Sequence, residues 1–373
     1  MTSTPGHPPR PRTGVLARLA IGIDIGGTKV AAGIVDETGQ VLDRLRRETP
    51  TTSPEAVEDT IAEVVTELRR HHRQRIWGVG IGAAGFVDAD RATVLFSPHL
   101  AWRREPLREA IRRRTGLRVV VENDANAAAW AEWRFGAARG EDDLVCVNLG
   151  TGIGGGMLFN GQLYRGHFGI AGEFGHMQVV PAGHRCECGN RGCWEQYASG
   201  NALVREAREL AQANSPVIHP LLERAGGDPR AISGPLVTAA AQAGDPAAVE
   251  LLTEVGQWLG VGIASLAAAF DPGLFIVGGG VSDAGDLLIG PARESFRKTL
   301  TGRGFRPEAR IVRTALGNEA GMIGAADLVR VERRRRRRGS RSRSRSRGRA
   351  RARAARTPGR PVLGVVGGED PSG

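Results

Sequence analysis

The chain has 373 residues, of which 41% are hydrophobic and 24% charged, so it is long enough for two domains and has an ordinary globular composition. Its formal net charge of +11 is concentrated at one end, since residues 331–373 contain 15 arginines and 3 acidic residues. Four cysteines are too few for a disulfide framework at this length, which excludes a disulfide-stapled secreted scaffold and favours a cytoplasmic protein. The apolar runs fall short of the about 20 residues that a membrane span needs, so we expect no membrane partner.

The N-terminal part of the chain predicts a short extension followed by strands. Residues 1–19 are basic and rich in proline, and Arg18 interrupts their apolar part, so we expect a disordered extension and not a signal peptide. Residues 20–48 alternate short apolar runs with glycine-containing turns, which is typical of three strands in a meander. A helix should follow over 54–72, because Ser53 suits its N-cap and Pro54 its first turn.

The next segments predict an alternation of strands and helices. We expect a buried strand over 77–85, a loop over 97–106 and a helix that ends near Thr115. A strand over 118–124 then leads into a helix over 125–136. This alternation is typical of an α/β protein.

The segment that follows, 144–164, repeats the pattern of the first strands. Asn148 stands where Asp24 stood and Gly150 where Gly26 stood, at a constant offset of 124 residues. Matched units of strand, glycine turn and strand indicate a duplicated architecture, in which two similar domains face each other across a cleft. We therefore expect an N-terminal α/β domain over 20–122 and a larger C-terminal α/β domain over 123–316.

The C-terminal part predicts one long helix, one buried strand and a closing helix. Asp245-Pro246 opens an apolar helical pattern that stops at Asp271-Pro272, and a strand over 273–282 ends in a glycine cluster. A helix over about 317–331 closes the globular part, and we expect it to pack back on the N-terminal domain. Residues 332–373 consist of arginine runs and Arg-Ser repeats, so we expect a disordered tail.

Glycine turns with nearby donors predict a phosphate site. The first, DIGGTK at 24–29, offers glycines for close backbone approach and the side chains of Thr28 and Lys29 as donors. It is not a Walker A loop, because a strand pattern follows it. The second, GTGIGGG at 150–156, comes from the repeated segment, so the two turns together would clamp the β- and γ-phosphates of a nucleotide. A third cluster, 278–280, ends a buried strand, where nucleotides commonly bind.

Asn123 and Asp124 lie at a predicted strand-to-helix junction. Asn and Asp are favoured helix N-caps, which is one explanation for this pair. A carboxylate that projects beside a bound triphosphate is also what a kinase needs, because it can accept the proton of the attacking hydroxyl. We interpret Asp124 as a candidate general base.

Three cysteines within eight residues predict a zinc site. Cys186, Cys188 and Cys193 supply three thiolate ligands, and a tetrahedral zinc needs a fourth. His176 and His184 are the candidates, and we favour His176 because the ten residues before Cys186 let it fold back freely. A fully protein-bound zinc is structural, and it would hold Glu173, His176 and Glu195 in a rigid loop over 173–196. Carboxylates and an imidazole suit sugar hydroxyls.

The chain resembles the ROK family of sugar kinases in the identity and order of six motifs. These are DIGGTK, ENDANAAAWAE, LGTGIGGG, GEFGHM, CECGNRGCWEQYASG and IVGGGVS. The resemblance covers about residues 20–330 and is greatest to bacterial glucokinases of the actinobacterial type. It implies a duplicated actin-like ATPase/hexokinase (ribonuclease H-like) fold with two domains around a cleft. It also implies transfer of phosphate from ATP, with Mg²⁺, to the 6-hydroxyl of glucose.

The resemblance assigns roles residue by residue. It implies that Asp124 is the catalytic base and that Asp24 lies near Mg²⁺ through water. The implied sugar contacts are Gly85, Asn123, Asp124, Glu173, His176 and Glu195. The implied zinc ligands are His176, Cys186, Cys188 and Cys193. The implied phosphate and adenosine contacts are Asp24, Gly26, Gly27, Thr28, Lys29, Gly150, Thr151, Gly152, Gly278, Gly279 and Gly280.

Alternatives remain open at the level of sequence. The same family contains sugar-responsive transcription regulators, but these carry a winged helix-turn-helix ahead of the first phosphate loop, and 23 residues before Asp24 are too few for it. N-acetylmannosamine, N-acetylglucosamine or fructose could replace glucose, and polyphosphate could replace ATP. The tail could contact nucleic acid non-specifically. We also expect a homo-oligomer, a dimer or tetramer, supported by large apolar helices such as 246–269.

Overall fold

The computed structural model describes residues 18–331, apart from residues 51, 52, 73 and 99. The extension expected at 1–19 therefore lies almost wholly outside the described residues. The same is true of the arginine-rich tail at 332–373 and of the nucleic acid contact expected for it. Residues as far as Arg330 group into one unit, so the domain boundary predicted at 122/123 is still a proposal.

The first sheet contains the meander expected from the N-terminal sequence. Its strand order is β3-β2-β1-β4-β8, in which β2 runs antiparallel to β1 and β3, whereas β4 and β8 run parallel to β1. Ser53 caps α1 by accepting a hydrogen bond from Ala56 N, and Pro54 is the first helical residue, as predicted. The bounds are β1 (Ala20–Ile25), β2 (Lys29–Val35), β3 (Val41–Glu48), β4 (Val79–Ala83), β8 (Val119–Asn123), α1 (Pro54–His71) and α2 (Leu107–Thr115).

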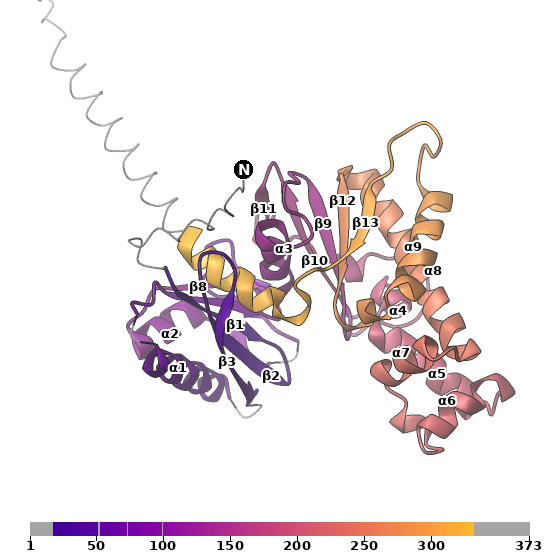
Figure 1. The fold of residues 1–373 in the computed structure, drawn as a ribbon, viewed down its shortest axis with the longest axis horizontal. Helices are drawn as coiled ribbons and strands as arrows, with labels where there is room; N and C mark the ends of the chain where they lie inside the picture. The colour runs from indigo at the N-terminus through magenta and orange to yellow at the C-terminus, as the bar shows by residue number, and fades with distance from the viewer. Residues whose placement is uncertain (1–17, 51–52, 73, 99, 332–373) are drawn as a thin grey trace, which may run out of the picture. The chain divides into compact units, whose positions relative to one another are not determined.

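Helices cover both faces of the first sheet (Figure 1). α1 and α2 pack on one face, where Ile21, Ile23 and Ile25 are fully buried. The final helix, residues 320–331, packs on the other face, as we expected from the sequence. It lies so close that a Cβ on Gly22 would be 1.9 Å from Met322 O, and one on Gly80 would be 1.7 Å from Ala325 O. Only glycine permits this backbone approach.

The second sheet repeats the topology of the first. Its order, β11-β10-β9-β12-β13, has the same antiparallel pairs on one side and the same parallel pairs on the other. The duplication inferred from the offset of 124 residues is thus confirmed in strand order and direction. The bounds are β9 (Leu144–Leu149), β10 (Ile153–Phe159), β11 (Gln162–Tyr164), β12 (Leu274–Gly278), β13 (Arg310–Arg313) and α3 (Asp124–Phe135).

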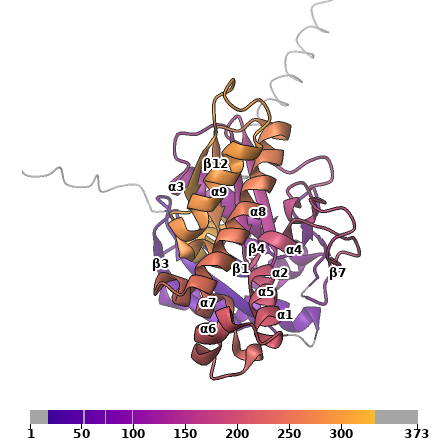
Figure 2. The same cartoon turned by 90° about the vertical axis from the view of Figure 1, so that its right-hand side faces the viewer.

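The long helix α8 (Pro246–Phe270) lies in the core of the C-terminal half. Asp245 caps it and Asp271 ends it in the left-handed region, as the sequence predicts. Gly256 and Gly260 bring it against α9 (Asp286–Thr299), and Figure 2 shows the two helices side by side. A Cβ on Gly260 would lie 2.4 Å from Ala292 O.

The length and composition of α8 would suit a membrane span, so our expectation that the apolar runs fall short of one does not hold for this helix. Within the structure, 61% of its most apolar window is buried. Its apolar side chains therefore form the protein core. For the same reason they do not support the oligomer that we had inferred from this helix, and the oligomer stays a prediction.

Some elements were missed or misread in the sequence. The stretch read as a loop over 97–106 contains β7 (Arg103–Glu105), which joins β5 (Phe86–Val87) and β6 (Val94–Phe96) in a small antiparallel sheet. The helices between 195 and 245 were not assigned: α4 (Glu195–Ala198), α5 (Gly200–Gln212), α6 (His219–Arg224) and α7 (Gly234–Gln242). Short 3₁₀ turns complete the fold: η1 (Phe174–His176), η2 (Pro216–Ile218), η3 (Pro229–Ala231), η4 (Gly280–Ala284) and η5 (Gly317–Glu319).

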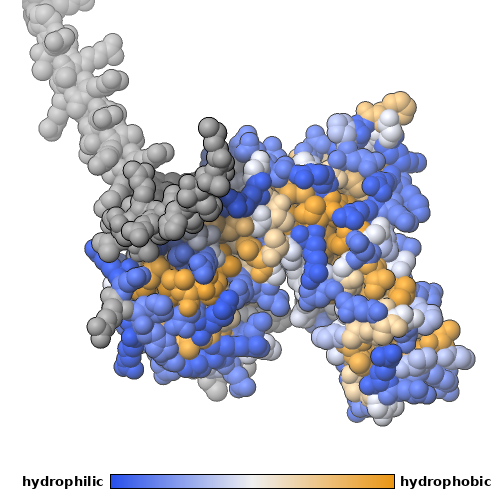
Figure 3. Space-filling model, viewed as in Figure 1, coloured by the Kyte–Doolittle hydropathy of each residue, from blue (hydrophilic) through white to orange (hydrophobic). Residues whose placement is uncertain are grey.

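The surface of the described residues carries scattered apolar side chains. Phe305, in the loop between α9 and β13, is 98% exposed, and that loop forms the apolar tip at the upper right of Figure 3. Phe168 and Val217 are also exposed, but they belong to other segments. Single exposed apolar residues are normal on a protein surface and by themselves indicate no docking face.

Candidate active site and metal centre

The junction between β8 and α3 holds the candidate base. Asn123 is the N-cap of α3, since its Oδ1 accepts a hydrogen bond of 3.0 Å from Asn126 N. The capping role that could have explained Asp124 therefore belongs to its neighbour. Asn123 Nδ2 donates to Gly85 O at 3.2 Å and to Asp124 Oδ1 at 3.0 Å, and Ala125 N donates to the same oxygen at 2.9 Å. Gly85, Asn123 and Asp124 form one hydrogen-bonded group.

The first glycine turn brings a second carboxylate close to Asp124. Asp24 pairs with Gly82 across the parallel strands β1 and β4. A Cβ on Gly82 would lie 3.5 Å from Asp124 Cα and 3.7 Å from Asp24 Oδ1, so the glycine separates the two acidic residues. Burial, and to a smaller extent the charge of Asp124, raise the pKa of Asp24 to about 7, and Lys29 opposes the shift. The turn is closed by a hydrogen bond from Gly26 N to Lys29 O at 3.0 Å.

The second glycine turn, residues 150–152, joins β9 to β10 and lies against Glu195. A Cβ on Gly152 would be 2.4 Å from Glu195 Oε2, and Ile153 N donates to that oxygen at 3.4 Å. Gly200 N donates to Gly150 O at 2.8 Å, and Asn201 N donates to Thr151 O at 3.4 Å. The turn is thus held between a carboxylate and the first residues of α5.

The third glycine cluster lies beside the second turn. Gly278 ends β12 and pairs with Asn148 of the parallel strand β9. Gly279, at φ 80°, turns the chain into η4, which begins at Gly280. A Cβ on Gly279 would be 2.3 Å from Leu149 O. The two glycine clusters of the C-terminal half are therefore adjacent, as a shared nucleotide site requires.

The loop that begins at residue 165 places two carboxylates around one imidazole. His176 Nε2 lies 3.9 Å from Glu173 Oε2, and His176 Nδ1 lies 3.4 Å from Glu195 Oε1. The pKa of Glu173 is raised overall, chiefly because its side chain is partly buried. His176 opposes this shift, and the charges of Asp124 and Glu195 add to it. The interaction with Asp124 places this group and the β8–α3 junction in one region.

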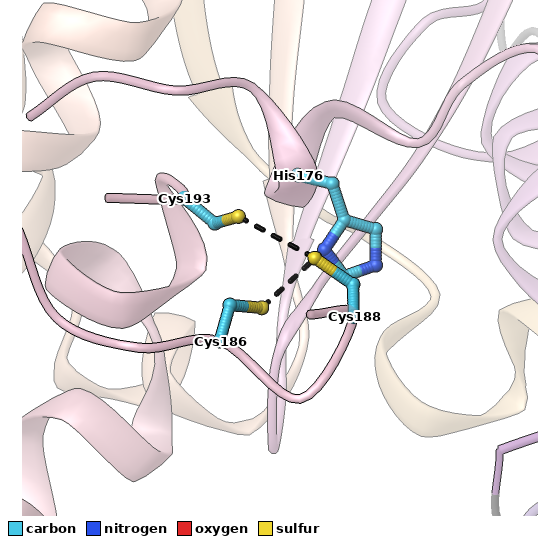
Figure 4. A group of neighbouring side chains, drawn as sticks. All are labelled: His176, Cys186, Cys188 and Cys193. Carbon is cyan, nitrogen blue, oxygen red and sulfur yellow. Dashed lines mark hydrogen bonds between the residues drawn. The ribbon is translucent and has the colours of Figure 1, made fainter. Parts of the chain in front are cut away.

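The metal ligands expected from the sequence come together (Figure 4). The ligand atoms of His176, Cys186, Cys188 and Cys193 all lie within 4.8 Å of one another. Cys186 Sγ lies 3.7 Å from His176 Nδ1, and Cys188 Sγ lies 3.6 Å from Cys193 Sγ. A tetrahedron with Zn–S bonds of about 2.3 Å has S–S edges of about 3.7 Å. The donor set and its spacing therefore fit zinc.

The alternatives for this cluster do not fit the structure. All three cysteines are free, so no disulfide competes with the metal. The other candidate ligand, His184, has its ring 5.3 Å from that of Tyr197, and its backbone N–H donates to the Tyr197 hydroxyl at 2.9 Å. It supports the loop and is not part of the four-residue cluster.

A buried tryptophan anchors the metal loop on the core. Trp194, between Cys193 and Glu195, is fully buried and donates from Nε1 to Trp258 O of α8 at 2.8 Å. Its backbone N–H donates to Met177 O at 2.8 Å, which ties the two ends of the loop together. The core thus fixes the loop that carries the candidate metal ligands.

Sequence reasoning missed a buried carboxylate beside the candidate base. Glu122 is 1% exposed, directly precedes Asn123 and is bound by Arg165 and Arg91. Glu122 could have been noticed as a charge in an otherwise apolar strand. Its partners could not, because they lie 43 and 31 residues away, without a pattern that links them.

Comparisons with known proteins identify the family of this chain. The ROK family model matches residues 20–332. A glucokinase of Streptomyces coelicolor is 52% identical over 312 residues, which cover 84% of this chain and 98% of that protein. A glucokinase of Thermotoga maritima is 37% identical over 313 residues, 83% of this chain and 96% of that protein.

A solved structure adds ligands to the comparison. The ROK family glucokinase of Streptomyces griseus, in complex with glucose and AMPPNP, matches with a TM-score of 0.78 and 52% identity. The match covers 84% of this chain and 99% of that one.

Proposed function

This chain belongs to the ROK family, and we propose that it is a glucokinase, which transfers the γ-phosphoryl group of ATP to the 6-hydroxyl of glucose. The observation that carries the proposal is 52% identity, over 84% of the chain, to a glucokinase whose structure holds glucose and an ATP analogue. The chain has the duplicated actin-like ATPase fold of these enzymes, which is visible in its two sheets of equal strand order.

Asp124 is the general base of this proposal. As the glucose 6-oxygen forms a bond to the γ-phosphorus, the bond from that phosphorus to the β–γ bridging oxygen breaks. The hydroxyl proton then goes to the Asp124 carboxylate. Positioning a base in this way is typically worth about 10²–10⁴ in rate. Asn123 orients the carboxylate through its 3.0 Å hydrogen bond, and Gly85 O in turn orients the Asn123 amide.

Glu173, His176 and Glu195 are the proposed sugar-binding residues, together with Gly85, Asn123 and Asp124. Carboxylates accept hydrogen bonds from hydroxyl groups, and charged acceptors make the stronger bonds. His176 presents its two nitrogens to different partners. Nδ1 faces Cys186, as a zinc ligand should, which leaves Nε2 on the side of Glu173 as a donor for a sugar hydroxyl.

The glycine turns are the proposed phosphate and nucleotide contacts. Backbone N–H groups of Gly26, Gly27 and the turn at 150–152 can approach phosphate oxygens closely, with Thr28 and Lys29 as further donors. Residues 278–280 lie where the adenosine would bind. Mg²⁺ prefers oxygen ligands, and Asp24 offers a carboxylate at this turn. When bound, Mg²⁺ neutralises phosphate charge.

His176, Cys186, Cys188 and Cys193 are the proposed ligands of a structural zinc. Four protein ligands leave no open position for a water or a substrate, so the metal would stabilise the loop and take no part in the chemistry. We also propose a cytoplasmic location, because the thiols must stay reduced to bind zinc and ATP must be available. A homo-oligomer remains part of the proposal without a structural argument.

The experiment is a coupled assay that compares glucose, mannose, fructose, N-acetylglucosamine and N-acetylmannosamine as acceptors, each with ATP or polyphosphate as donor. We expect the highest kcat/KM with glucose and ATP. A higher value with another hexose or with polyphosphate would replace that part of the proposal. Absence of phosphorylation with every pair would overturn the kinase assignment and favour a sugar-responsive regulator.

A further inference from the structure

Glu122 is a buried carboxylate two residues before the proposed base, Asp124. Its Oε1 accepts hydrogen bonds from Asn123 N at 3.0 Å and from Asn126 Nδ2 at 3.3 Å. The same oxygen accepts from Arg165 Nε at 2.9 Å, and Oε2 lies 2.8 Å from Arg91 Nε. A buried carboxylate is costly unless charges and donors surround it, and this one has both.

Arg165 reaches Glu122 from the other half of the duplicated fold. It follows β11 directly, and its side chain is 9% exposed. Besides Glu122, its guanidinium donates to three backbone carbonyls at the end of β5 and in the loop after it: Val87 at 3.2 Å, Asp88 at 2.9 Å and Ala89 at 3.1 Å. A planar guanidinium with five donors can hold all four acceptors, whereas the ammonium of a lysine cannot.

Arg165 is also the first residue of the loop that carries the proposed sugar contacts. Its carbonyl accepts a hydrogen bond from Ala171 N at 3.1 Å, which closes the start of that loop. Gly169, at φ 90°, lies against the same loop after β5, so that a Cβ there would be 2.7 Å from Ala89 N. Glu173 and His176 follow within a few residues. One guanidinium therefore fixes the start of the sugar loop and the strand end that precedes Asp124.

We infer that Arg165 and Glu122 form a positioning pair, which holds the proposed base and the proposed sugar contacts in register with each other. The inference rests on the proposed function. Neither residue is placed in contact with the substrate; both act through Asn123, Asp124 and the loop that begins at 165. Loss of the pair should shift the sugar relative to the base while the phosphate turns keep their structure.

The test uses the full chain with Arg165→Met, Arg165→Lys, Glu122→Gln and the double variant Glu122→Gln/Arg165→Met. We expect Arg165→Met to raise KM for glucose at least about 10-fold and lower kcat about 10- to 100-fold, with KM for ATP changed less than about 2-fold. A merely destabilised enzyme would show fewer active molecules and unchanged KM values. Arg165→Lys should recover part of the loss, because it keeps the charge beside Glu122 but not the fork.

The double variant measures the coupling. Arg165→Met leaves Glu122 with Arg91 but without Arg165, and Glu122→Gln leaves Arg165 without its carboxylate partner. Because each single change thus leaves a buried charge less well compensated, the double variant should lose less than the product of the two single losses. Losses that multiply would contradict the pair. Arg108→Met is the matched control: Arg108 donates to Asp90 O at 2.8 Å in the same part of the fold but is more exposed. It should change kcat and both KM values less than about 2-fold.

The same proteins separate this inference from the proposed function. Calorimetric sugar binding needs no turnover, so weaker sugar binding by Arg165→Met would support the pair even if the wild-type chain phosphorylates a different hexose or none. If wild-type chain and Arg165→Met bind the preferred sugar equally and have equal kcat, the positioning pair is overturned, whatever the sugar is.

Discussion

Asp24 at the end of β1 and Asn148 at the end of β9 occupy the same place in two sheets of equal strand order, yet only Asp24 can carry a charge. Each faces a glycine of the neighbouring parallel strand, Gly82 in the first sheet and Gly278 in the second. Asp24 shares its surroundings with Asp124 and Lys29, and its pKa is raised to about 7.

The duplication preserves strand geometry but not charge. Both hairpins present glycines from which backbone N–H groups can approach phosphates. A carboxylate at both strand ends would add a negative charge beside a triphosphate, which Coulomb repulsion disfavours. A single acidic residue, on the side of the proposed base, leaves the other hairpin free of formal charge at that position.

The strongest test of the difference between the halves is Asp124→Asn. If Asp124 is the base, this variant should lower kcat about 10²–10⁴-fold with a modest change in KM for glucose. Asp286→Asn is a matched control, because Asp286 is likewise the first residue of a helix, α9, but its side chain is 91% exposed. Near-normal kcat in Asp124→Asn, measured by the coupled assay, would refute the base assignment.

The second test concerns a feature found in one half only. After β3 the chain enters α1, whereas after β11 it forms the loop with the cysteines. Cys188→Ser should lose bound zinc, so that His176 is no longer fixed in place. KM for glucose should then rise at least about 10-fold, as is typical when a residue that orients a metal site is lost. Metal analysis and kinetics measure both effects.

Cys146→Ala is the control for the zinc prediction, since Cys146 lies buried in β9, outside the cluster. It should keep one equivalent of zinc. An active, metal-free wild-type enzyme would contradict the structural site.

The third test exchanges the residue types of the two hairpins: Asp24→Asn removes the carboxylate of the first, and Asn148→Asp introduces one in the second. Because the folded-state pKa of Asp24 is raised to about 7 from 3.8, the folded chain binds more protons than the unfolded chain between these values. The free energy of unfolding should therefore fall as pH rises through this window. Asp24→Asn should remove this loss and raise the free energy of unfolding by on the order of 4 kcal/mol at pH 8, but by little at pH 4. Urea unfolding without nucleotide or Mg²⁺ measures this.

Asn148→Asp is the reciprocal variant. It should introduce a pH-dependent loss of stability of the same sign and raise KM for ATP. Equal free energies of unfolding for wild type and Asp24→Asn at pH 8 would show that ionisation of Asp24 costs no stability. The two hairpins would then differ in sequence but not in their effect on stability.

The smallest effect is expected for a segment outside both halves. Removal of residues 332–373 should change kcat and KM for glucose less than about 2-fold, because the proposed site lies within residues 24–280. The same change should abolish retention on DNA at low salt if the arginines cause it. Unchanged retention would assign the basic surface to the folded part.

The local features of the fold could be predicted from the sequence because they depend on neighbouring residues. Ser53-Pro54 and Asp245-Pro246 mark two helix starts correctly, since capping and the fixed φ of proline act within one turn. The offset between Asp24 and Asn148 identified the duplication. The cysteine spacing and His176 predicted the cluster of His176, Cys186, Cys188 and Cys193, because these four residues all lie in one short loop.

The features that were missed depend on residues far apart in the chain. The pairing of Glu122 with Arg165 joins two halves of the molecule across 43 residues, and neither residue has a local signature. The small sheet of β5, β6 and β7 was read partly as a loop, because its strands have two or three residues and too few positions for an alternating pattern. Tertiary contacts alone specify these elements.

The final helix over 320–331 has a consequence for the order in which the protein forms. During synthesis the last strand of the first sheet, β8, ends at Asn123, but the helix that covers part of one face of this sheet begins only at residue 320. Domains usually fold as units from the N-terminus. α3 covers part of this face as soon as it is made, but Gly22 and Gly80 remain without the helix that packs on them while the whole second half is translated. The N-terminal half can therefore be completed only after the C-terminal half has been translated, so that the first part of the chain to be made is not the first to be finished.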